Sequence, residues 1–347
     1  MTFPRGIFWL TNESPGLCKR MKMHALRIVQ NKAFNCISTS SAIPCFSNLA
    51  DPMQIVSITW ARNEADILES FVRHNASIVD RMVIVLHKTT DNSPTILNML
   101  KEEDIAVDFR TDEQPLHRQT EVLTTLMHEL AQYEPPTWIL PLDADEFLIS
   151  VENADPRKEI ETLERTVVHL LPWRTYVPTN RDSSAEQDIV RRIVFRKSHE
   201  RPLFSKVLIP GIVAADGNIC LAPGNHGIIR RTPNGEEIPV HAIPTPHLSL
   251  AHFPVRSEQQ LRRKITQGWP STRDLPTRKP RENYHWEQLF DRCMDPAPIH
   301  REELREIALH YAAQKEDSVD LVADPVPQRY TRIRFAQDHA SVPPQTQ

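Results

Sequence analysis

The stretch Trp138–Ser150, W-I-L-P-L-D-A-D-E-F-L-I-S, decides how this chain folds and where its chemistry lies. Its first five residues form an apolar run of the kind that fills a buried strand. Asp143, Asp145 and Glu146 then crowd three carboxylates at the carboxyl end of that strand. Carboxylates in a buried setting repel one another and lose hydration, so the stretch favours a site that holds a cation.

A turn between Asp143 and Asp145 would let both carboxylates reach a hard cation such as Mg²⁺ or Mn²⁺. Such a cation neutralises diphosphate oxygens. The simpler interpretation is an acidic turn that ends a strand. The apolar residues on both sides of the carboxylates, including Phe147-Leu148-Ile149, favour the metal site.

The composition is that of a globular protein. The chain has 347 residues, of which 40% are apolar and 25% charged, and its formal net charge is −4. This length allows one large domain or two of ordinary size. The slightly negative charge excludes a strongly basic nucleic-acid-binding protein, so we expect no nucleic acid among its partners.

The sequence favours a cytoplasmic protein. No apolar stretch approaches the ~20 residues that span a bilayer, and the cluster Gly6–Leu10 is too short for a secretory signal. The five cysteines are widely spaced and form no C-x-x-C pair. This pattern fits reduced thiols better than a disulfide framework or a zinc site.

Residues 1–52 are expected to be a poorly ordered N-terminal extension. They show no sustained periodicity and contain three of the five cysteines. Met53 is a candidate start of the folded unit. The alternative is a targeting peptide, because basic residues dominate this segment.

From Gln54 the apolar pattern alternates between strand and helix periods. Expected strands are Gln54–Trp60, Arg81–His87, Ile105–Phe109 and Thr137–Leu142, and expected helices are Glu64–Ala76, Pro94–Glu103 and Thr120–Tyr133. This alternation predicts an α/β fold with a parallel sheet and helices on both faces.

Beyond Ser150 the pattern is less regular. We expect a helix leading into a strand within Glu159–Leu170, strands at Asp188–Phe195, Leu203–Ile209 and Leu248–Phe253, and helices at Ser257–Gln267 and Ile299–Gln314. Ser257 is expected to cap its helix and Gly268 to end it. Residues 271–347 are expected to form a helical C-terminal region that ends in a tail from Ala340.

Three polar pairs follow predicted strands, namely Asn63/Glu64, Asp91/Asn92 and Asp143/Asp145. In parallel sheets, ligands bind beyond the carboxyl ends of the strands. We therefore expect these pairs to meet at one edge of the sheet.

Five blocks in order give the chain a family resemblance. They are A-R-N-E-A-D-I-L-E-S-F-V-R-H-N within Ile55–Asn75, D-A-D-E-F, F-S-K-V-L-I-P at Phe204–Pro210, P-G-N-H-G at Pro223–Gly227, and A-H-F-P-V-R-S with the following K-I and G within Ala251–Gly268. Together they resemble family 2 glycosyltransferases, more narrowly the branch near family 92. The resemblance implies a GT-A fold over residues 53–270, in which a mostly parallel nucleotide-binding sheet adjoins a smaller mixed acceptor-side region.

The resemblance implies a divalent cation, Mn²⁺ or Mg²⁺, that neutralises the leaving diphosphate as a Lewis acid. It places Asp145 on the metal and Asp143 near the ribose or the metal. A third ligand is expected from His226 first and His252 second. The alternative for each histidine is a structural role, bonded to backbone.

The end of the first strand supplies Thr59, Arg62, Asn63 and Glu64 as candidates that bind the donor nucleotide, and Asp91 is the analogous candidate after the second strand. The alternatives are structural. Asn63 can cap the following helix, Glu64 can favour its dipole, and Asp91 can form a turn.

Lys206, Arg256 and Lys264 lie in family-like blocks and are candidates to bind the donor's phosphates. For Lys264 the sequence favours a solvated helix face, because two further arginines adjoin it.

The general base has three acidic candidates, Glu146, Glu200 and Asp216, of which we favour Glu200 and Glu146. The Glu-Asp pair usual for the family's base is absent. Inversion at the sugar carbon is implied by the resemblance alone.

We therefore expect a cytoplasmic, metal-dependent, hexosyltransferase-like glycosyltransferase. A UDP-sugar is the favoured donor, and a glycan or lipid-linked precursor in polysaccharide biosynthesis is the expected acceptor, with peripheral association at the inner membrane. The alternatives are a non-catalytic sugar- or nucleotide-binding protein on a degenerate GT-A fold and a metal-dependent phosphohydrolase.

Overall fold

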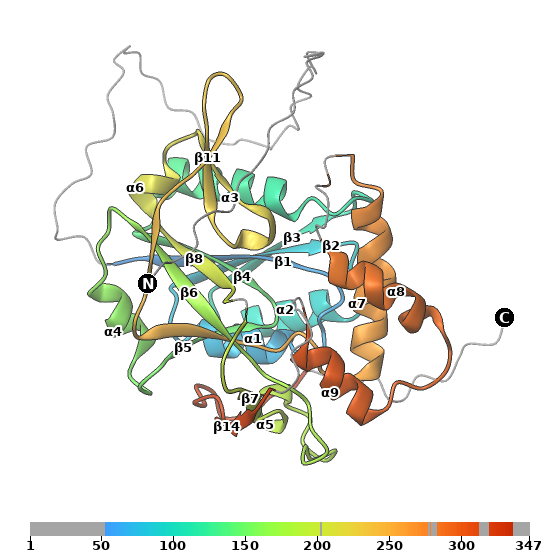
Figure 1. Ribbon diagram of the computed structural model, residues 1–347. Helices are drawn as coiled ribbons and strands as arrows, with labels where there is room; N and C mark the ends of the chain where they lie inside the picture. The colour runs from blue at the N-terminus through green and yellow to red at the C-terminus, as the bar shows by residue number, and fades with distance from the viewer. Residues whose placement is uncertain (1–52, 202, 277, 279–282, 312–318, 336–347) are drawn as a thin grey trace, which may run out of the picture. The chain divides into compact units, whose positions relative to one another are not determined.

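The computed structural model describes residues 53–335 except residues 202, 277, 279–282 and 312–318 (Figure 1). The predicted extension 1–52, the tail from Ala340 and the end of the helix predicted to reach Gln314 lie outside the described residues. The division of the chain at residues 52 and 270 stays a prediction.

The first half alternates strands and helices in the predicted order. Its elements are β1 (Ile55–Ala61), α1 (Leu68–Asn75), β2 (Arg81–His87), α2 (Ser93–Glu102), β3 (Val107–Asp112), α3 (Gln119–Tyr133) and β4 (Trp138–Asp143). The strands lie in the order β3-β2-β1-β4 and all run parallel. Their carboxyl ends therefore meet at one edge, as the sequence predicted.

Successive side chains of β1 enter two different cores. Ile55 and Ala61 pack with α1 and α2, whereas Val56, Ile58 and Trp60 pack with α3. Figure 1 shows α1 and α2 below this sheet and α3 above it. Because both faces are covered, β1, β2 and β4 are buried over almost their whole length, and Ser57 and Thr59 of β1 are buried as well.

The second half continues the sheet with mixed strand directions. Its elements are β5 (Glu146–Ser150), α4 (Pro156–Glu161), β6 (Val168–Thr175), α5 (Ile189–Arg192), β7 (Phe195–Lys197), β8 (Ser205–Pro210), α6 (Gly211–Ala214), β9 (Ile219–Leu221), the 3-10 turn η1 (Pro223–Asn225), β10 (Ile228–Arg231), β11 (Glu237–Pro239), β12 (Ala242–Pro244) and β13 (Leu248–His252). The sheet continues from β4 through β8, β6 and β13 to β5, with β12 beside β6. The predicted α/β class, a mostly parallel sheet flanked by helices with a smaller mixed region, is confirmed.

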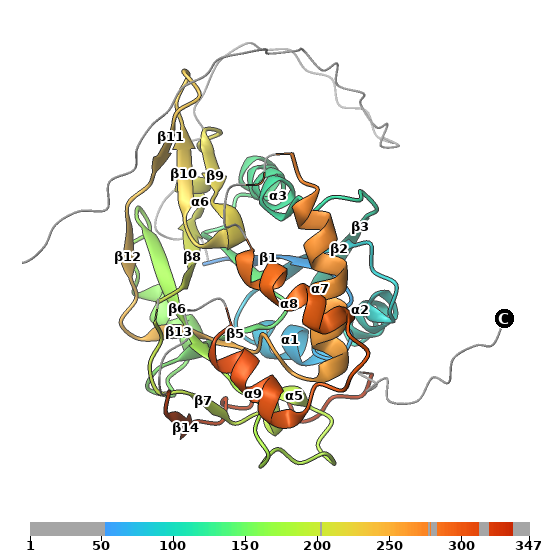
Figure 2. The ribbon, with the colours of Figure 1, turned by 45° about the vertical axis from the view of Figure 1, so that its right-hand side comes forward.

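Three helices follow at the carboxyl end of the sheet. They are α7 (Glu258–Arg273), α8 (Tyr284–Met294) and α9 (Arg301–Leu309), and the short strand β14 (Leu321–Ala323) pairs with β7. They share a separate apolar cluster that includes Ile265, Cys293 and Ala308. Figures 1 and 2 both show α7 and α8 beside the end of β1, where Asn63 Nδ2 donates to Gln267 Oε1 over 2.7 Å.

Gly268 does not end α7, so that prediction is wrong. Ser257 does cap the helix, because its hydroxyl accepts from Gln260 N at 3.1 Å, but the helix continues to Arg273. A Cβ at residue 268 would lie 2.7 Å from the ring of Trp286. The glycine instead lets α8 approach α7 closely.

The strand predicted at Asp188–Phe195 is largely wrong as well. Asp188 accepts from Val190 N at 3.1 Å and starts the short helix α5, and only Phe195 belongs to a strand. The capping carboxylate overrides the apolar alternation of this segment.

Candidate active site

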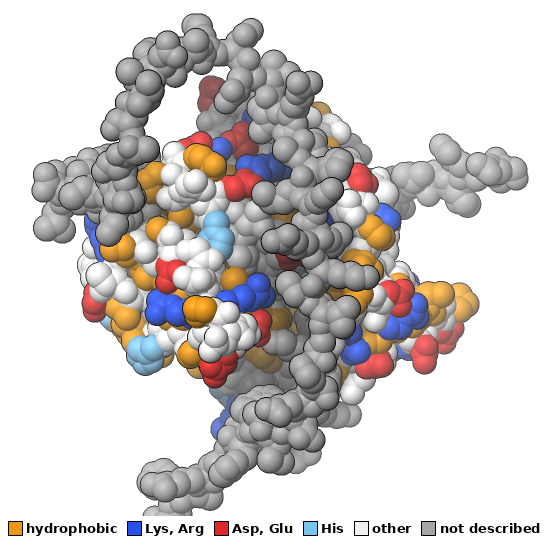
Figure 3. Space-filling model, turned by 90° about the horizontal axis from the view of Figure 1, so that it is seen from above, with side chains coloured by type: hydrophobic (Ala, Val, Ile, Leu, Met, Phe, Trp, Pro, Cys, Tyr) orange, Lys and Arg blue, Asp and Glu red, His pale blue; other side chains and the backbone are white. Residues whose placement is uncertain are grey.

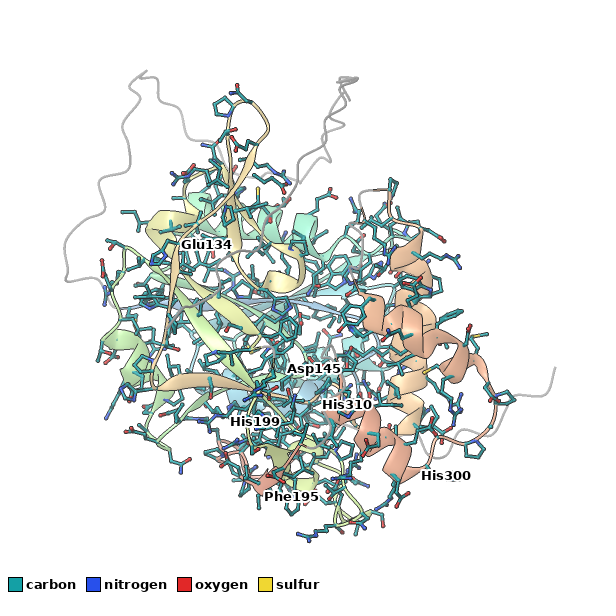
Figure 4. All side chains as sticks on the ribbon, viewed as in Figure 1. Glu134, Asp145, Phe195, His199, His300 and His310 are labelled. Atoms are coloured by element: carbon teal, nitrogen blue, oxygen red, sulfur yellow. The ribbon has the colours of Figure 1, made fainter. Side chains whose placement is uncertain are left out.

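Asp143 and Asp145 lie on the turn that links β4 to β5. Asp143 N donates to Glu146 Oε2 at 2.9 Å, and Phe253 N donates to Asp145 O at 2.9 Å. Both aspartates line a cavity of about 1120 Å³ at the carboxyl ends of β1 and β4. In Figure 4, Asp145 lies between the sheet and the C-terminal helices. The turn thus brings both carboxylates into the cavity.

The carboxylate of Asp143 is held by a buried lysine. Lys206 Nζ donates to Asp143 Oδ2 at 2.6 Å and to Gly224 O at 2.7 Å, and it lies 3.5 Å from Glu146 Oε1. Its side chain is 0% exposed. Gln119 Nε2 donates to the other oxygen of Asp143 at 2.7 Å. Both oxygens of Asp143 are therefore engaged.

The carboxylate of Asp145 faces basic groups from α7 and the loop before it. Lys264 Nζ donates to Asp145 Oδ2 at 2.8 Å, and Arg256 Nη1 lies 3.6 Å from the same oxygen. Arg256 also binds Asp66 at 2.8 Å and makes a short contact with Glu64. Burial alone would raise the pKa of Asp145, but the charge of Lys264 holds it below its usual value.

Two glutamates next to these pairs have raised pKa values. Burial raises the pKa of Glu146 to about 8 and that of Glu64 to about 7. Glu146 is fully buried, and Trp173 Nε1 donates to its Oε1 at 2.6 Å. Glu64 instead lines the cavity.

The histidines predicted as ligands are neutral. Burial lowers the pKa of His226 to about 4 and that of His252 to about 3. His226 Nδ1 donates to Ser205 O at 2.9 Å, which leaves the lone pair on Nε2. His252 Nε2 lies 3.9 Å from Asp145 Oδ1. Both rings border the cavity.

A chain of neighbouring rings lines the cavity, with successive centroids 4.1 to 6.4 Å apart. In order these rings are His87, Trp60, His117, Trp286, His285, Tyr311, His252, Trp173, His226 and Phe204. Aromatic walls with a few placed polar groups are typical of small-molecule sites.

The structure brings some of the predicted site residues together and not others. Those that line the cavity are Arg62, Glu64, Asp143, Asp145, His226, His252 and Lys264. Those that do not line it are Thr59, Asn63, Asp91, Glu146, Glu200, Lys206, Arg256 and Asp216.

Asn63 and Asp91 fix the loops beside the cavity. Asn63 Oδ1 accepts from Thr90 N at 2.7 Å, and Asp91 accepts from Ala65 N and from Ser93 N, both at 3.0 Å. Asn63 and Asp91 thus have structural roles, which the sequence analysis gave as the alternative to nucleotide binding. Asn63 also has a φ of 55°, a left-handed conformation that asparagine tolerates.

The two favoured general bases lie outside the cavity wall. Glu200 accepts from Thr175 N at 2.6 Å and lies 3.3 Å from Lys197 Nζ. Glu146 is enclosed by Trp173, Lys206 and the backbone of the turn.

Lys264 does not lie on a solvated face, so that interpretation is wrong. Its side chain is 18% exposed, borders the cavity and lies 5.5 Å from the centroid of the Tyr311 ring. Gln119 and His117, which the sequence analysis did not single out, follow β3. The strand-end rule that located Asn63 also points to them.

The carboxylates of Asp143 and Asp145 do not fit a divalent cation in this arrangement. Both oxygens of Asp143 and Oδ2 of Asp145 already accept from ammonium or amide groups, and the two ammonium groups lie within 2.8 Å. Only Oδ1 of Asp145 is left, with His252 Nε2 at 3.9 Å. Within the described part of the chain, no three or more His, Cys, Asp or Glu side chains are grouped so that they could hold a metal ion. A metal ion would have to displace Lys264 before it could bind Oδ2 of Asp145.

Acidic and basic side chains lie interspersed over the face seen in Figure 3. Among the described helices, none is both long and apolar enough to cross a membrane.

No protein-family model and no curated protein matches this sequence. Among solved structures, the chain is similar to a UDP complex of S. aureus TarS, with 10% identity over 70% of this chain and 71% of that chain and a TM-score of 0.34. It is also similar to the mannosyltransferase PcManGT from Pyrobaculum calidifontis in complex with GDP-Man and Mn²⁺, with 15% identity and a TM-score of 0.28. That similarity covers 35% of this chain and only 36% of the mannosyltransferase.

A third similar structure is glucosyl-3-phosphoglycerate synthase from Mycobacterium tuberculosis with Mn²⁺, UDP and its product. It is 15% identical over 35% of this chain and 44% of that chain, with a TM-score of 0.25. At these identities and TM-scores the similarities carry no functional argument.

Proposed function

We propose that this protein is a glycosyltransferase that binds a nucleoside diphosphate sugar in the cavity. One observation carries the proposal. Asp143 and Asp145 share the cavity wall with the basic side chains of Arg62, Arg263 and Lys264. The cavity lies at the carboxyl ends of parallel strands, where nucleotides bind in open α/β sheets. Lysine and arginine there suit a diphosphate.

The donor's parts are assigned by chemistry. The diphosphate lies against Lys264 and the two arginines. Asp143 accepts from a ribose hydroxyl, and Trp60, stacked on His87 with centroids 4.7 Å apart, offers a wall for the base. The family 2 resemblance of the sequence blocks supports this GT-A assignment and a UDP-sugar that carries a hexose.

The acceptor side is assigned to the C-terminal helices. Trp286, His285 and Tyr311 border the cavity and present ring faces and polar edges. The C–H face of a sugar ring packs on such rings, so a glycan or lipid-linked saccharide is the proposed acceptor.

The base that takes the acceptor's proton is proposed among carboxylates. Glu200 and Glu146 stay predictions from the sequence. Glu64 is the candidate that lines the cavity, and its raised pKa of about 7 suits a base that works near neutral pH. Inversion of configuration at the anomeric carbon is implied by the family resemblance alone. A role in polysaccharide biosynthesis, cytoplasmic location and peripheral membrane association also stay predictions.

The test is thermal unfolding of the full chain against UDP, GDP, ADP, CDP and dTDP, with and without Mn²⁺. At a ligand concentration 100 times Kd, binding adds about 2.7 kcal/mol, or about 5–10 °C in Tm for a domain of this size. We expect one nucleotide to give this shift and Asp145→Ala to abolish it. The paired samples also test the sequence prediction of Mn²⁺ or Mg²⁺.

Enzymatic assays separate the alternatives. Slow hydrolysis of the matching nucleotide sugar, absent in Asp145→Ala, indicates a transferase. Binding without turnover indicates a non-catalytic sugar- or nucleotide-binding protein. Free phosphate released from simple phosphate esters indicates a phosphohydrolase. No shift with any nucleotide, for a folded protein, would contradict the proposed function.

A further inference from the structure

Each of the two aspartates of the D-A-D stretch has one carboxylate oxygen bound by a lysine ammonium group. Lys206 holds Asp143 and Lys264 holds Asp145, at 2.6 Å and 2.8 Å. The positive charge that such carboxylates require is therefore already supplied by side chains of this chain.

Lys206 is locked in position. Its ammonium group has a carboxylate and a carbonyl as acceptors, a second carboxylate at 3.5 Å, and the Trp173 ring centroid at 5.7 Å. The side chain is fully buried. A metal ion at Oδ2 of Asp143 would have to displace this fully buried ammonium group.

Lys264 is the ammonium that faces the cavity. It forms an ion pair with Asp145 and lies near the ring of Tyr311, and 18% of its side chain is exposed. Arg62 and Arg263 line the same cavity. An incoming diphosphate thus meets three basic side chains, and Lys264 can donate to Asp145 and to a phosphate oxygen at once because an ammonium has three donors.

Given the proposed donor site, on which this rests, we propose that Lys264 and Lys206 take the place of the divalent cation. Lys264 binds the donor's diphosphate directly, and Lys206 neutralises the carboxylates behind it. Donor binding and transfer then need no metal ion. A lysine and a divalent metal both stabilise charge on a leaving phosphate, so either can serve this step.

The transfer step balances without a further reactant. The acceptor oxygen forms a bond to the anomeric carbon while the bond from that carbon to the phosphate oxygen breaks. The bonding electrons leave with the nucleoside diphosphate, and the phosphate oxygen that becomes negatively charged accepts a hydrogen bond from Lys264. The acceptor's proton passes to a carboxylate base and then to solvent. Lys264 stays protonated throughout.

The experiment uses the full chain purified with a chelator. Tm and Kd are measured for UDP, GDP, ADP, CDP and dTDP in EDTA and again with excess Mn²⁺ or Mg²⁺. We expect the nucleotide that binds to give the same Kd, within about threefold, in both conditions. Lys264→Met should weaken that Kd at least tenfold, because a charge-assisted hydrogen bond is lost. Lys264→Arg should keep binding in EDTA.

Arg273→Met is the matched control. Arg273 lies on the same helix as Lys264, and its ion-pair partner among the described residues is the exposed Asp274, so the change removes the same charge away from the cavity. It should leave the Kd unchanged. If Lys264→Met does not fold, the chelator comparison on the native chain decides alone.

Two results overturn the proposal, and they are distinguishable. Binding that appears only with Mn²⁺ or Mg²⁺ refutes metal independence and leaves the glycosyltransferase function intact. No binding of any nucleotide under either condition refutes the proposed function and this assignment together.

Discussion

Replacing Lys206 with methionine should destabilise the fold by about 3–5 kcal/mol. Methionine keeps most of the side-chain volume but removes the ammonium group. Lys206 Nζ lies 2.6 Å from Asp143 Oδ2 and 3.5 Å from Glu146 Oε1, and both Lys206 and Glu146 are fully buried. The variant therefore leaves the Asp143 carboxylate without its cation.

The magnitude follows from these distances. At an effective dielectric constant of about 20, the ion pair of Lys206 with Asp143 corresponds to about 6 kcal/mol of Coulomb attraction. Glu146, whose pKa burial raises to about 8, is largely protonated near neutral pH and adds little to this attraction. Relief from desolvating the ammonium offsets much of this attraction. What remains is the cost of removing one partner of a buried pair, about 3–5 kcal/mol, which lowers Tm by about 6–20 °C.

The assay is equilibrium unfolding in urea, with calorimetry for Tm. Lys101→Met is the control, because Lys101 pairs with Asp108 at the surface, where 46% of the lysine side chain is exposed. It should change stability by no more than about 1 kcal/mol. Asp143→Asn completes a double-mutant cycle, in which Lys206→Met should cost less than in the native background. A Lys206→Met protein as stable as the control would refute the reasoning.

Three further predictions concern pH, packing and binding. Stability should fall as the pH drops from about 6.5 to about 5, because burial lowers the pKa of several histidines to about 3 or 4 in the folded state, so only the unfolded chain takes up their protons. These histidines are His74, His117, His226, His252 and His285. Glu64 and Glu146, with raised pKa values, bind protons in the folded state and offset two of the five. The net slope therefore rises to about 4 kcal/mol per pH unit near pH 5, where the unfolded histidines are fully protonated. Urea unfolding at several pH values measures the slope, and a flat profile contradicts it. Gly268→Ala should destabilise by about 1–3 kcal/mol through its clash with Trp286, whereas Gly217→Ala, with no atom within 4 Å of the new Cβ, should not; calorimetry compares them. Nucleotide binding should change tryptophan fluorescence, since Trp60 lines the cavity, and Trp60→Phe should reduce that change.

Sequence alone predicted the first half of the fold because its strands are decided locally. In β2 and β4 the apolar run, its length and the polar residue that ends it are all contiguous. The positions of Asp143 and Asp145 at the sheet edge followed from the end of β4. Such features need no knowledge of distant contacts.

The partners of those aspartates could not be predicted in the same way. Lys206 and Lys264 lie 63 and 119 residues from their carboxylates in the chain. Which face of α7 meets the cavity depends on the packing of α8, and that packing depends on Gly268, which local rules assign to a helix end. The error over Gly268 and the error over Lys264 therefore have one origin.

A D-x-D sequence does not by itself specify a metal site. Its carboxylates require compensating positive charge, and either a divalent ion or fixed basic side chains can supply it. Fixed side chains hold their dipoles and charges in place before the donor arrives, so little reorganisation is needed when charge develops on the leaving diphosphate. The ammonium group of Lys264, which compensates the charge of Asp145, excludes a second cation from Oδ2 of that carboxylate. Of the two lysines paired with these aspartates, Lys264 is the one that faces the cavity. Substitution of Lys264 therefore distinguishes compensation by a metal ion from compensation by a side chain more directly than substitution of either aspartate.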